Sequence, residues 1–470
     1  MELGQIDQDK GSNNIFENHV LAGVQGTALI SNGLSEFRNK RVLMLQGPVG
    51  PFFARLGVDL THAGAVVFKV NFNGGDWLFS HSAAFSGVFN FRGKLGDWPG
   101  YLNDLLQRLN IDTVFLFGDC RPIHAAARDV IHQSGARVGV FEEGYLRPDY
   151  ITLERDGVNN NSWLPSDPAF YLQQPKRKLP TAQSLGSTYG QAAKWGMMYF
   201  AAATFGRIFF RHYQHHRRLG FADGPSWVAS FGRKHFYHRS EQHVLPALTG
   251  EQSGNFFLVS LQTKGDAQMS VHSRFKSVDA FIEYVMQSFA EHAPPGCQLV
   301  IKHHPLDRGY SDYTQLIGNL TQHYQLQGRC HYIHDQHLPT LLAHARGVVV
   351  VNSTVGLSAV GEGVPVKVCG KSIYDIQGLT FQGSLNDFWG SASEAVPNAA
   401  LYKAFRTYLI AHTQHQGSFY KQLPDVSYKS GVLWADHGLI ASHHEDKGRR
   451  PIHRKQDQPS GFGPAQHDDA

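Results

Sequence analysis

The chain has only four cysteines among its 470 residues, and no two of them form a CxxC pair. They stand far apart in the sequence, at Cys120, Cys297, Cys330 and Cys369. This spacing argues against a zinc ribbon and a disulfide framework and fits a reducing compartment. The N-terminal segment MELGQIDQDKGSNN lacks the apolar stretch of a secretory signal. We therefore expect a cytoplasmic protein.

Strong net charge is also lacking, since the formal charge at pH 7 is only +4. That value is too small to indicate nucleic-acid binding, and we expect no nucleic-acid partner. The apolar segment WGMMYFAAATFG at residues 195–206 is shorter than the roughly 20 residues that span a bilayer, and the basic segment RIFFRHYQHHRR follows it at 207–218. Two interpretations are open: an interfacial helix against an anionic membrane, or a core helix with a solvated basic end.

Three common motifs are absent as well. The chain has no GxxxxGK[ST] loop, no GxSxG elbow and no GxGxxG fingerprint, which disfavours P-loop, α/β-hydrolase and ordinary dinucleotide-binding chemistry. Two histidine groups are alternatives as metal ligands, although no Cys or carboxylate spacing completes either set. They are His303, His304 and Asp307, and His212, His215 and His216. We expect no metal and no cofactor.

What the sequence does contain is an alternation of apolar strands and helical segments. In residues 41–150, strands are predicted at the runs RVLML, VVFKVN, TVFLF and VGVF, with helices at 99–109 and 123–135 between them. A second series starts at Phe256, with strands at FFLVS, LVIK, GVVVV and VPVKV. This pattern is typical of doubly wound parallel sheets. We therefore expect an α/β protein with two Rossmann-like domains.

Composition and pattern divide the chain into six segments. They are a polar leader (1–38), a first Rossmann-like domain (39–158), a linker with the basic-aromatic helix (159–250), a second Rossmann-like domain (251–385), a C-terminal helical segment (386–440) and a disordered tail (441–470). Binding clefts form preferentially at domain interfaces. We therefore expect the deepest cleft between the two domains.

Carboxylates stand where two strands of the first domain end. The run TVFLFGD stops at Asp119, and the run VGVFEE stops at Glu142 and Glu143. Ligands of open α/β sheets bind beyond the carboxyl ends of the strands. One crossover helix between the two strands would bring their ends close together. We therefore expect the three carboxylates to line one cleft.

Two polar turns follow strands of the second domain. His304 precedes Pro305, which holds it extended, so its imidazole could bond a phosphate; lone histidines are nevertheless more often structural. Ser353 and Thr354 stand where a strand gives way to a helix. Their hydroxyls and the free backbone N–H groups suit a phosphate, although a simple N-cap explains the same residues.

Seven runs of the sequence resemble the capsular polysaccharide biosynthesis and export family KpsS/LipB. They are LQGPVGPFFARLGVDL, FKVNFNGGDW, FGDCRPIH, FEEGYLRPDYITLE, VNNNSWLP, KHHPLDRG and NSTVGLSAVGEGVPVKVCG. The resemblance implies a GT-B-like, retaining β-Kdo transferase that moves Kdo from CMP-Kdo to a (lyso)phosphatidylglycerol acceptor. Such an enzyme begins the poly-Kdo linker of a capsular polysaccharide and lies peripherally on the inner face of the inner membrane. The first domain would then bind the acceptor and the second the CMP-sugar.

The resemblance also implies roles for individual residues. A retaining enzyme needs a nucleophile and an acid/base, and we predict Asp119 as nucleophile with Glu142 or Glu143 as acid/base. Gln46, Gly47, Asn73 and Asp76 are the predicted acceptor contacts. The predicted CMP-sugar contacts are Lys302, His304, Pro305, Asn352, Ser353, Thr354, Arg121 and Arg147. The two arginines and the lysine would meet phosphate or carboxylate unless they pair with nearby acids.

Two other functions are alternatives. A non-catalytic export or assembly factor would act through other capsule proteins, and a GT-B-like sugar-nucleotide epimerase would act without a lipid. The first has no need of acidic, His and Ser/Thr turns at strand ends. The second leaves the basic-aromatic segment unexplained. The sequence therefore favours the transferase.

Overall fold

A computed structural model describes residues 33–179, 181–213, 224–264 and 273–434. Most of the expected leader and all of the expected disordered tail lie outside these ranges. The last residues of the segment expected to be a polar leader are ordered and partly buried. Residues Ser35–Phe37 form a 3-10 turn (η1), and Phe37 is fully buried, with its ring edge-on to Phe115 at a centroid distance of 5.4 Å. The ordered first domain therefore begins before residue 39.

The first domain is built on a seven-stranded sheet of order β12-β6-β5-β4-β1-β2-β3. Its strands are β1 (Arg41–Met44), β2 (Val66–Asn71), β3 (Phe85–Asn90), β4 (Thr113–Phe117), β5 (Arg137–Glu143), β6 (Tyr150–Arg155) and β12 (Gln414–Gln416). Neighbouring strands from β3 to β5 pair in parallel, whereas β6 pairs antiparallel with both β5 and β12. The carboxyl ends of five parallel strands therefore share one edge.

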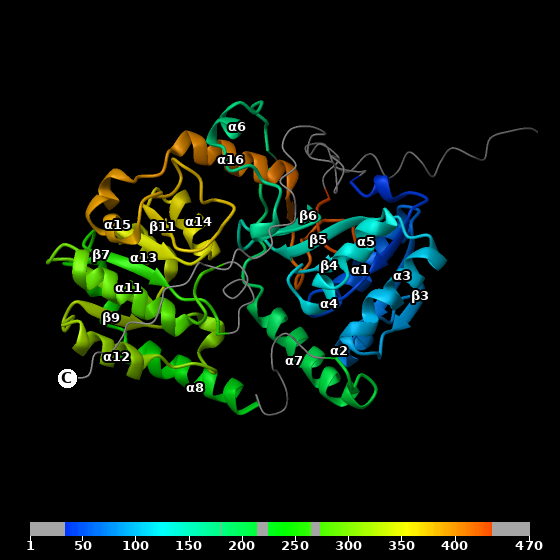
Figure 1. Cartoon of the computed structure of the whole chain (residues 1–470), viewed down its shortest axis with the longest axis horizontal. Helices are drawn as coiled ribbons and strands as arrows, with labels where there is room; N and C mark the ends of the chain where they lie inside the picture. Colours follow the sequence, from blue (N-terminus) through cyan, green and yellow to red (C-terminus); the bar gives the residue numbers. More distant parts are fainter. Residues whose placement is uncertain (1–32, 180, 214–223, 265–272, 435–470) are drawn as a thin grey trace, which may run out of the picture.

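Helices cover both faces of this sheet (Figure 1). They are α1 (Phe52–His62), α2 (Gly74–Leu78), α3 (Trp98–Leu109), α4 (Pro122–Ala125) and α5 (Arg128–Ser134). One face packs aromatic side chains of α1 against Phe115 and Phe141, and the other packs α3 and α5 against Leu116 and Val140. One prediction needs correction, because the single helix expected at 123–135 is divided into α4 and α5.

The second domain is a parallel five-stranded sheet of order β11-β10-β7-β8-β9. Its strands are β7 (Phe256–Ser260), β8 (Gln298–Lys302), β9 (Cys330–Ile333), β10 (Gly347–Val350) and β11 (Val366–Val368). The accompanying helices are α11 (Val278–His292), α12 (Thr314–His323), α13 (Leu338–His344), α14 (Thr354–Gly361) and α15 (Leu385–Ser391). Apolar clusters cover both faces, which explains why these strands read as continuous apolar runs.

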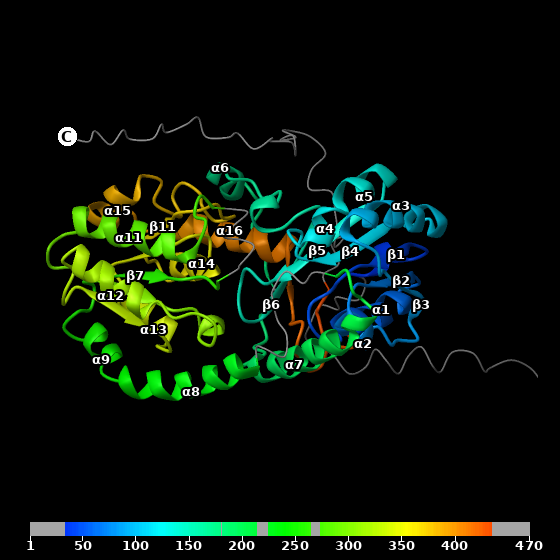
Figure 2. The same cartoon turned by 60° about the horizontal axis from the view of Figure 1, so that its bottom comes forward.

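Where the structure describes the stretch between the two domains, it contains four helices: α6 (Pro168–Leu172), α7 (Tyr189–Phe205), α8 (Gly224–Ser240) and α9 (Val244–Thr249). Figure 2 shows α7 and α8 following one another along one side of both domains. The predicted bounds of the helix at residues 195–218 are wrong. The helix begins at Tyr189 and ends at Phe205, Gly206–Ile208 form the 3-10 turn η4, and residues 214–218 lie outside the described ranges. Further 3-10 turns among the described residues are η2 (Leu95–Asp97), η3 (Asn159–Asn161), η6 (Pro305–Asp307) and η7 (Ala392–Glu394).

The chain finally crosses back to the first domain through α16 (Ala399–His412) (Figure 1). Leu401 and Phe405 of α16 pack in the second domain's core, whereas the following strand β12 pairs with β6. Residues 413–434 of the segment expected to be helical up to residue 440 are therefore not helical, and residues 435–440 lie outside the described ranges. Phe419 and Trp434 of this segment bury their rings in the first domain. The expected α/β fold, with two Rossmann-like domains in a GT-B-like architecture, is confirmed.

Candidate active site

Two glutamates end β5 at the carboxyl edge of the first sheet. Glu142 and Glu143 are both half-buried. The charge of Glu143 acts on Glu142, but the two carboxyl groups have different hydrogen-bond partners. On the β4 side, Gly118 leaves space between two charged groups: a Cβ at this position would lie 3.6 Å from Glu142 Oε2 and 3.7 Å from Arg121 Nε.

The environment of Glu142 favours a protonated carboxyl. Burial raises the pKa of Glu142 to about 7, the negative charges of Glu143 and Asp119 add to this rise, and Arg121 opposes it. The main-chain N–H of Glu143 donates to Glu142 Oε1 at 3.0 Å. A carboxyl with a pKa near neutrality exchanges protons readily at physiological pH, as a general acid or base must.

Glu143 has a different partner. The hydroxyl of Tyr420 donates to Glu143 Oε1 at 2.7 Å. Tyr420 lies 277 residues further along the chain, in the segment after β12. The crossing of the chain back to the first domain therefore completes this end of the site, which no local sequence pattern indicates.

Asp119 is held inside the first domain. Its side chain is only 4% exposed, and Oδ2 accepts from Asn161 Nδ2 at 2.8 Å, from the Val158 main-chain N–H at 3.3 Å and from Arg128 Nη2 at 3.4 Å. Cys120 Sγ donates to the other oxygen at 3.3 Å. Protein donors thus surround the predicted nucleophile and tie the end of β4 to the η3 segment.

His124 lies beneath the same turn. It is 1% exposed, and its Nδ1 lies 2.7 Å from the Gly118 carbonyl oxygen. A carbonyl only accepts, so Nδ1 carries the proton. Burial lowers the pKa of His124 to about 3, and the nearby charge of Arg121 contributes to this. The histidine is therefore neutral, and its hydrogen bond to the Gly118 carbonyl holds the turn in place.

Arg121, predicted to bind the CMP-sugar, is engaged by the first domain. Its Nη1 donates to Gln46 Oε1 at 2.9 Å and to the Gly47 carbonyl at 3.2 Å, and its guanidinium carbon lies 4.9 Å from the centre of the Phe117 ring. Arg147, predicted for the same ligand, is exposed, and its Nε donates to the Gly144 carbonyl at 3.3 Å. Contact of either arginine with a donor stays a prediction.

The predicted acceptor residues lie beneath α7. Gln46, Asn73 and Asp76 are 1%, 2% and 5% exposed. Each of the three side chains hydrogen-bonds the Tyr199 hydroxyl of α7, with distances between 2.8 and 3.2 Å. Gly47 is buried against the Phe53 ring. The structure therefore brings these residues together with a tyrosine that the sequence did not single out. Their direct contact with an acceptor stays a prediction.

Of the residues predicted to bind the CMP-sugar in the second domain, one is buried and the others are accessible. Lys302 is 7% exposed, burial lowers its pKa, and its Nζ donates to the His334 carbonyl at 3.0 Å. The Lys302 side chain is thus hydrogen-bonded within the protein. The accessible residues at the carboxyl edge of the second sheet are His304, Pro305, Asn352, Ser353 and Thr354.

Two of these accessible residues cap helical turns. Ser353 Oγ accepts from the Val355 main-chain N–H at 3.3 Å and begins α14, and His304 Nδ1 accepts from the Leu306 N–H at 3.2 Å at η6. Asn352 Oδ1 accepts from Gln262 Nε2 at 2.7 Å. The capping alternative therefore holds for Ser353, and phosphate binding at this turn stays a prediction.

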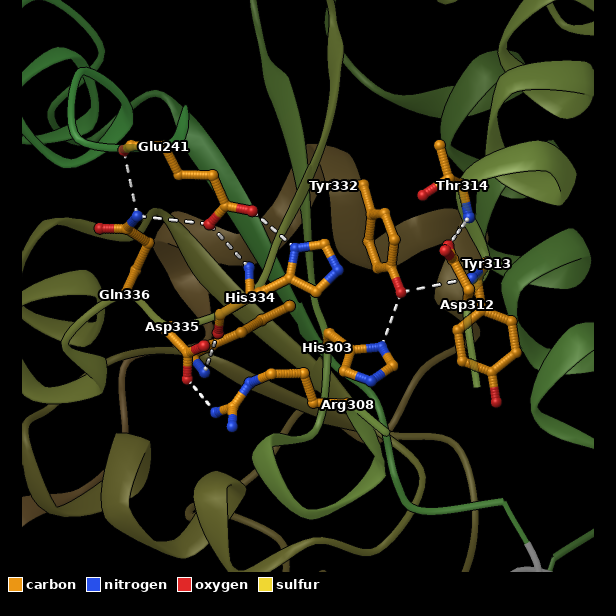
Figure 3. Close-up of polar contacts among 11 residues, drawn as sticks. Glu241, His303, Arg308, Asp312, Tyr313, Thr314, Tyr332, His334, Asp335 and Gln336 are labelled. Atoms are coloured by element: carbon orange, nitrogen blue, oxygen red, sulfur yellow. Dashed lines mark hydrogen bonds and ion pairs between the residues drawn. The ribbon is translucent and has the colours of Figure 1, made fainter. Parts of the chain in front are cut away.

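A histidine network beside β8 and β9 anchors the end of α8 (Figure 3). Glu241 accepts from His334 Nδ1 at 2.6 Å and from its main-chain N–H at 2.9 Å. The Tyr237 ring stacks on the His334 ring, with centroids 3.5 Å apart. His303 Nδ1 bonds the Tyr332 hydroxyl at 2.6 Å, and burial lowers the pKa of His303 to about 4. No sequence pattern indicated this network, because its members are separated by up to about ninety residues.

The described part of the chain holds no cluster of three or more His, Cys, Asp or Glu arranged to take a metal ion. His215 and His216, named above as alternative ligands, lie outside the described ranges. Within those ranges, no helix has both the length and the apolar character needed to cross a bilayer. None of the four cysteines, all of which lie in the described ranges, forms a disulfide.

Comparison with known proteins identifies the family. A family model described as capsule polysaccharide biosynthesis protein matches residues 112–420. The capsule polysaccharide export protein KpsS of Escherichia coli is 39% identical over 382 residues, which cover 81% of this chain and 97% of that protein. The capsule polysaccharide modification protein LipB of Neisseria meningitidis is 39% identical over 394 residues, covering 82% and 92%. A solved glycosyltransferase from Rickettsia africae aligns over 79% of this chain and 94% of its own at 8% identity and a TM-score of 0.35, a likeness too distant to bear on chemistry. The chain belongs to the capsule polysaccharide biosynthesis family that includes KpsS and LipB.

Proposed function

We propose that the protein is a retaining glycosyltransferase of capsule biosynthesis, which transfers Kdo from CMP-Kdo to a (lyso)phosphatidylglycerol acceptor. The carrying observation is Glu142, a half-buried carboxyl at the sheet edge whose pKa burial raises to about 7. The Tyr420 hydroxyl donates to the neighbouring Glu143 at 2.7 Å. Retaining transfer needs two carboxyl groups, one that exchanges a proton with the acceptor and one that attacks the donor. Family membership and the two-domain fold support this function.

In the proposed reaction, Glu143 is the nucleophile. One of its carboxylate oxygens attacks the anomeric carbon of the donor, the bond from that carbon to the phosphate oxygen breaks, and CMP leaves with the electron pair. Glu142 then takes the proton of the acceptor hydroxyl while the hydroxyl oxygen attacks the same carbon. Glu143 is released as a carboxylate, and the two inversions give net retention. Asp119 Oδ2 already accepts hydrogen bonds from three groups of the protein. For this reason Glu143, and not Asp119, is proposed as the nucleophile.

The donor nucleotide is proposed to bind the second domain. Ser353 and Thr354 stand at the N-terminus of α14, and His304 is half-exposed at the end of the neighbouring strand. Backbone N–H groups and the helix dipole at such a position favour a phosphate. The CMP phosphate would therefore lie at this edge, with the sugar directed toward Glu142 and Glu143.

A lipid acceptor requires access to a membrane surface, and the α7 region supports peripheral binding at the inner face of the inner membrane. Five apolar side chains of α7 and the turn after it are exposed: Met197, Met198, Phe205, Ile208 and Phe209. Residues 189–240 contain eight Lys and Arg but a single acid, Asp223. Exposed apolar side chains combined with cationic charge suit an anionic bilayer surface.

A trapping experiment tests this function. Full-length protein is incubated with CMP-Kdo and a fluorescent phosphatidylglycerol, and both lipid and protein are analysed by mass spectrometry. We expect one Kdo on the lipid with the native protein. With Glu142→Gln, which cannot deprotonate the acceptor, we expect a Kdo ester on Glu143, and with Glu143→Gln neither product.

The other outcomes separate the alternatives. An adduct on Asp119 would return the nucleophile to that residue. Isomerised donor without lipid product would indicate an epimerase. A folded protein that binds vesicles but changes neither substrate would indicate an export or assembly factor.

A further inference from the structure

The side chain of Gln46 holds Arg121 in place at the edge of the candidate active site. Arg121 Nη1 donates to Gln46 Oε1 at 2.9 Å and to the Gly47 carbonyl at 3.2 Å. A guanidinium only donates hydrogen bonds, so it selects the oxygen end of the amide. The position of the arginine thus depends on how the Gln46 amide is oriented.

The nitrogen end of the same amide faces α2, α7 and Tyr213. Gln46 Nε2 donates to Asp76 Oδ2 at 3.1 Å and to the Tyr199 hydroxyl oxygen at 3.2 Å. The Tyr213 hydroxyl oxygen lies 2.8 Å from Gln46 Nε2 and 3.1 Å from Gln46 Oε1. The Tyr199 hydroxyl in turn donates to Asp76 Oδ1 at 2.8 Å. Turning the amide over would place donor against donor at Arg121 and oxygen against oxygen at Asp76. The orientation is therefore set from both ends.

Helix α7 reaches this network through Tyr199, its one buried residue. The approach is close: a Cβ on Gly74 would lie 2.1 Å from the Ala202 carbonyl oxygen, and one on Gly75 would lie 2.7 Å from the Tyr199 ring. Only glycine admits α7 at this distance. The preceding residues of the helix, Met197 and Met198, are exposed. A single helix therefore links the proposed lipid-facing surface to the Gln46 amide.

We propose that Tyr199, Asp76 and Gln46 form a positioning relay, through which the docking of α7 fixes Arg121 beside Glu142 and so sets the charge state of the catalytic carboxyl. The relay rests on the proposed catalytic use of Glu142. Tyr199, Asp76 and Gln46 act by holding Arg121, the arginine that flanks the space above Gly118.

The charged groups around Glu142 give the direction of the effect. Some groups shift the pKa of Glu142 by their charge, and others have their own pKa shifted by the charge of Glu142. Together they are Glu143 from β5, Asp119, Cys120 and Arg121 from the turn after β4, and Tyr145 and Tyr420. Arg121 is the cation of this set, and it favours the ionised form of Glu142. Releasing Arg121 therefore raises the pKa of Glu142 further, so less of the base is ionised at neutral pH.

The test measures the Glu142 carboxyl directly. Isotope-edited infrared titration of full-length protein follows its band, assigned by its loss in Glu142→Gln. Tyr199→Phe and Gln46→Met each break the relay, and we expect both to raise the Glu142 pKa by about one unit. Transfer at pH 7 should then fall roughly fivefold in kcat with an unchanged KM for the donor. Tyr171→Phe is the matched control, because it also removes one buried tyrosine hydroxyl bond, to the Pro165 carbonyl at 2.5 Å.

An unchanged Glu142 pKa in both variants would overturn the relay. If Tyr199→Phe fails to fold, Gln46→Met decides the question, because it leaves the bond from Tyr199 to Asp76 intact. A native protein whose Glu142 titrates near pH 7 and responds to both variants, yet transfers no sugar, would refute the proposed function and leave the relay standing.

Discussion

Glu142 and Arg121 flank the same small space, which exists because residue 118 has no side chain. A Cβ at Gly118 would lie 3.6 Å from Glu142 Oε2 and 3.7 Å from Arg121 Nε, and the backbone there has a φ of +71°. An atom of a bound substrate that entered this space would touch the carboxyl and the guanidinium together.

Gly118→Ala should therefore impair catalysis beyond its effect on stability. The positive φ alone should cost about 1 kcal/mol of unfolding free energy, and the methyl group also occupies the space between Glu142 and Arg121. The matched control is Gly135→Ala, because Gly135 has a φ of +78° and a Cβ there would meet no atom within 4 Å. We expect equal losses of Tm but a loss of transfer activity only for Gly118→Ala. Equal activity in the two variants would show that the space is not used.

The raised pKa of Glu142 predicts opposite pH responses of activity and stability. As the base, Glu142 must be ionised, so transfer should rise through about pH 7 and then level off. Its ordinary pKa is 4.5, which applies to the unfolded chain. A group whose folded pKa is raised stabilises the fold fully below pH 4.5, and this contribution is lost as the pH rises through 7. Glu142→Gln should therefore flatten the decline of Tm between pH 5 and pH 8. An identical decline in the variant would contradict the assignment.

Asp119→Asn separates a structural role from a catalytic one. An amide in place of the carboxylate keeps one acceptor but weakens the bonds from Arg128 and Asn161, which lie 3.4 and 2.8 Å from Asp119 Oδ2. Bonds to a charged group contribute about 1.5–3 kcal/mol, so we expect a clear loss of Tm with measurable transfer remaining. Asn161→Ala is the control for the loss of one such bond. Abolished transfer at an unchanged Tm would make Asp119 the nucleophile.

The strands that the sequence predicts correctly are those buried on both faces. β4, β7 and β10 are short runs of Val, Phe and Leu, and burial within a parallel sheet requires that composition. β12 has the sequence Gln-His-Gln and pairs with β6 only because α16 carries it back to the first domain. No local pattern contains that information, so its segment was expected to be helical.

The same distinction applies to the candidate site. Glu142 and Glu143 were predicted from their position at a strand end, which is local information. Tyr420 and Tyr199, which bond Glu143 and Gln46, lie 277 and 153 residues from those partners. Arg121 was predicted as a ligand-binding residue, but its bond to Gln46 depends on how two strand ends meet. Pairings of this kind follow from topology and cannot be found from motif spacing.

Glu241→Gln should loosen α8 from the second domain. Glu241 accepts two hydrogen bonds from His334, at 2.6 and 2.9 Å (Figure 3). The ring of Tyr237 stacks on the same histidine. Weakening a charge-assisted bond of this kind should cost about 1.5–3 kcal/mol. Hydrogen exchange should quicken in α8 and remain unchanged in α11. Thr249→Val is the control, because it removes an exposed hydroxyl bond of the nearby α9. Unchanged exchange in α8 would show that Glu241 does not anchor the helix.

Ser353→Ala tests whether the α14 N-terminus binds the donor phosphate. Ser353 Oγ caps α14, and Ser384 Oγ caps α15 through the Asp387 N–H at 3.2 Å, so Ser384→Ala is the same change at another helix. Each substitution should cost about 1 kcal/mol of stability. Only Ser353→Ala should also weaken CMP binding, by roughly fivefold if one hydroxyl bond to the phosphate is lost. Calorimetric titration with CMP measures this difference directly. Equal CMP affinity in the two variants would reduce Ser353 to a cap and move the donor phosphate away from α14, toward the half-exposed His304 at the neighbouring strand end.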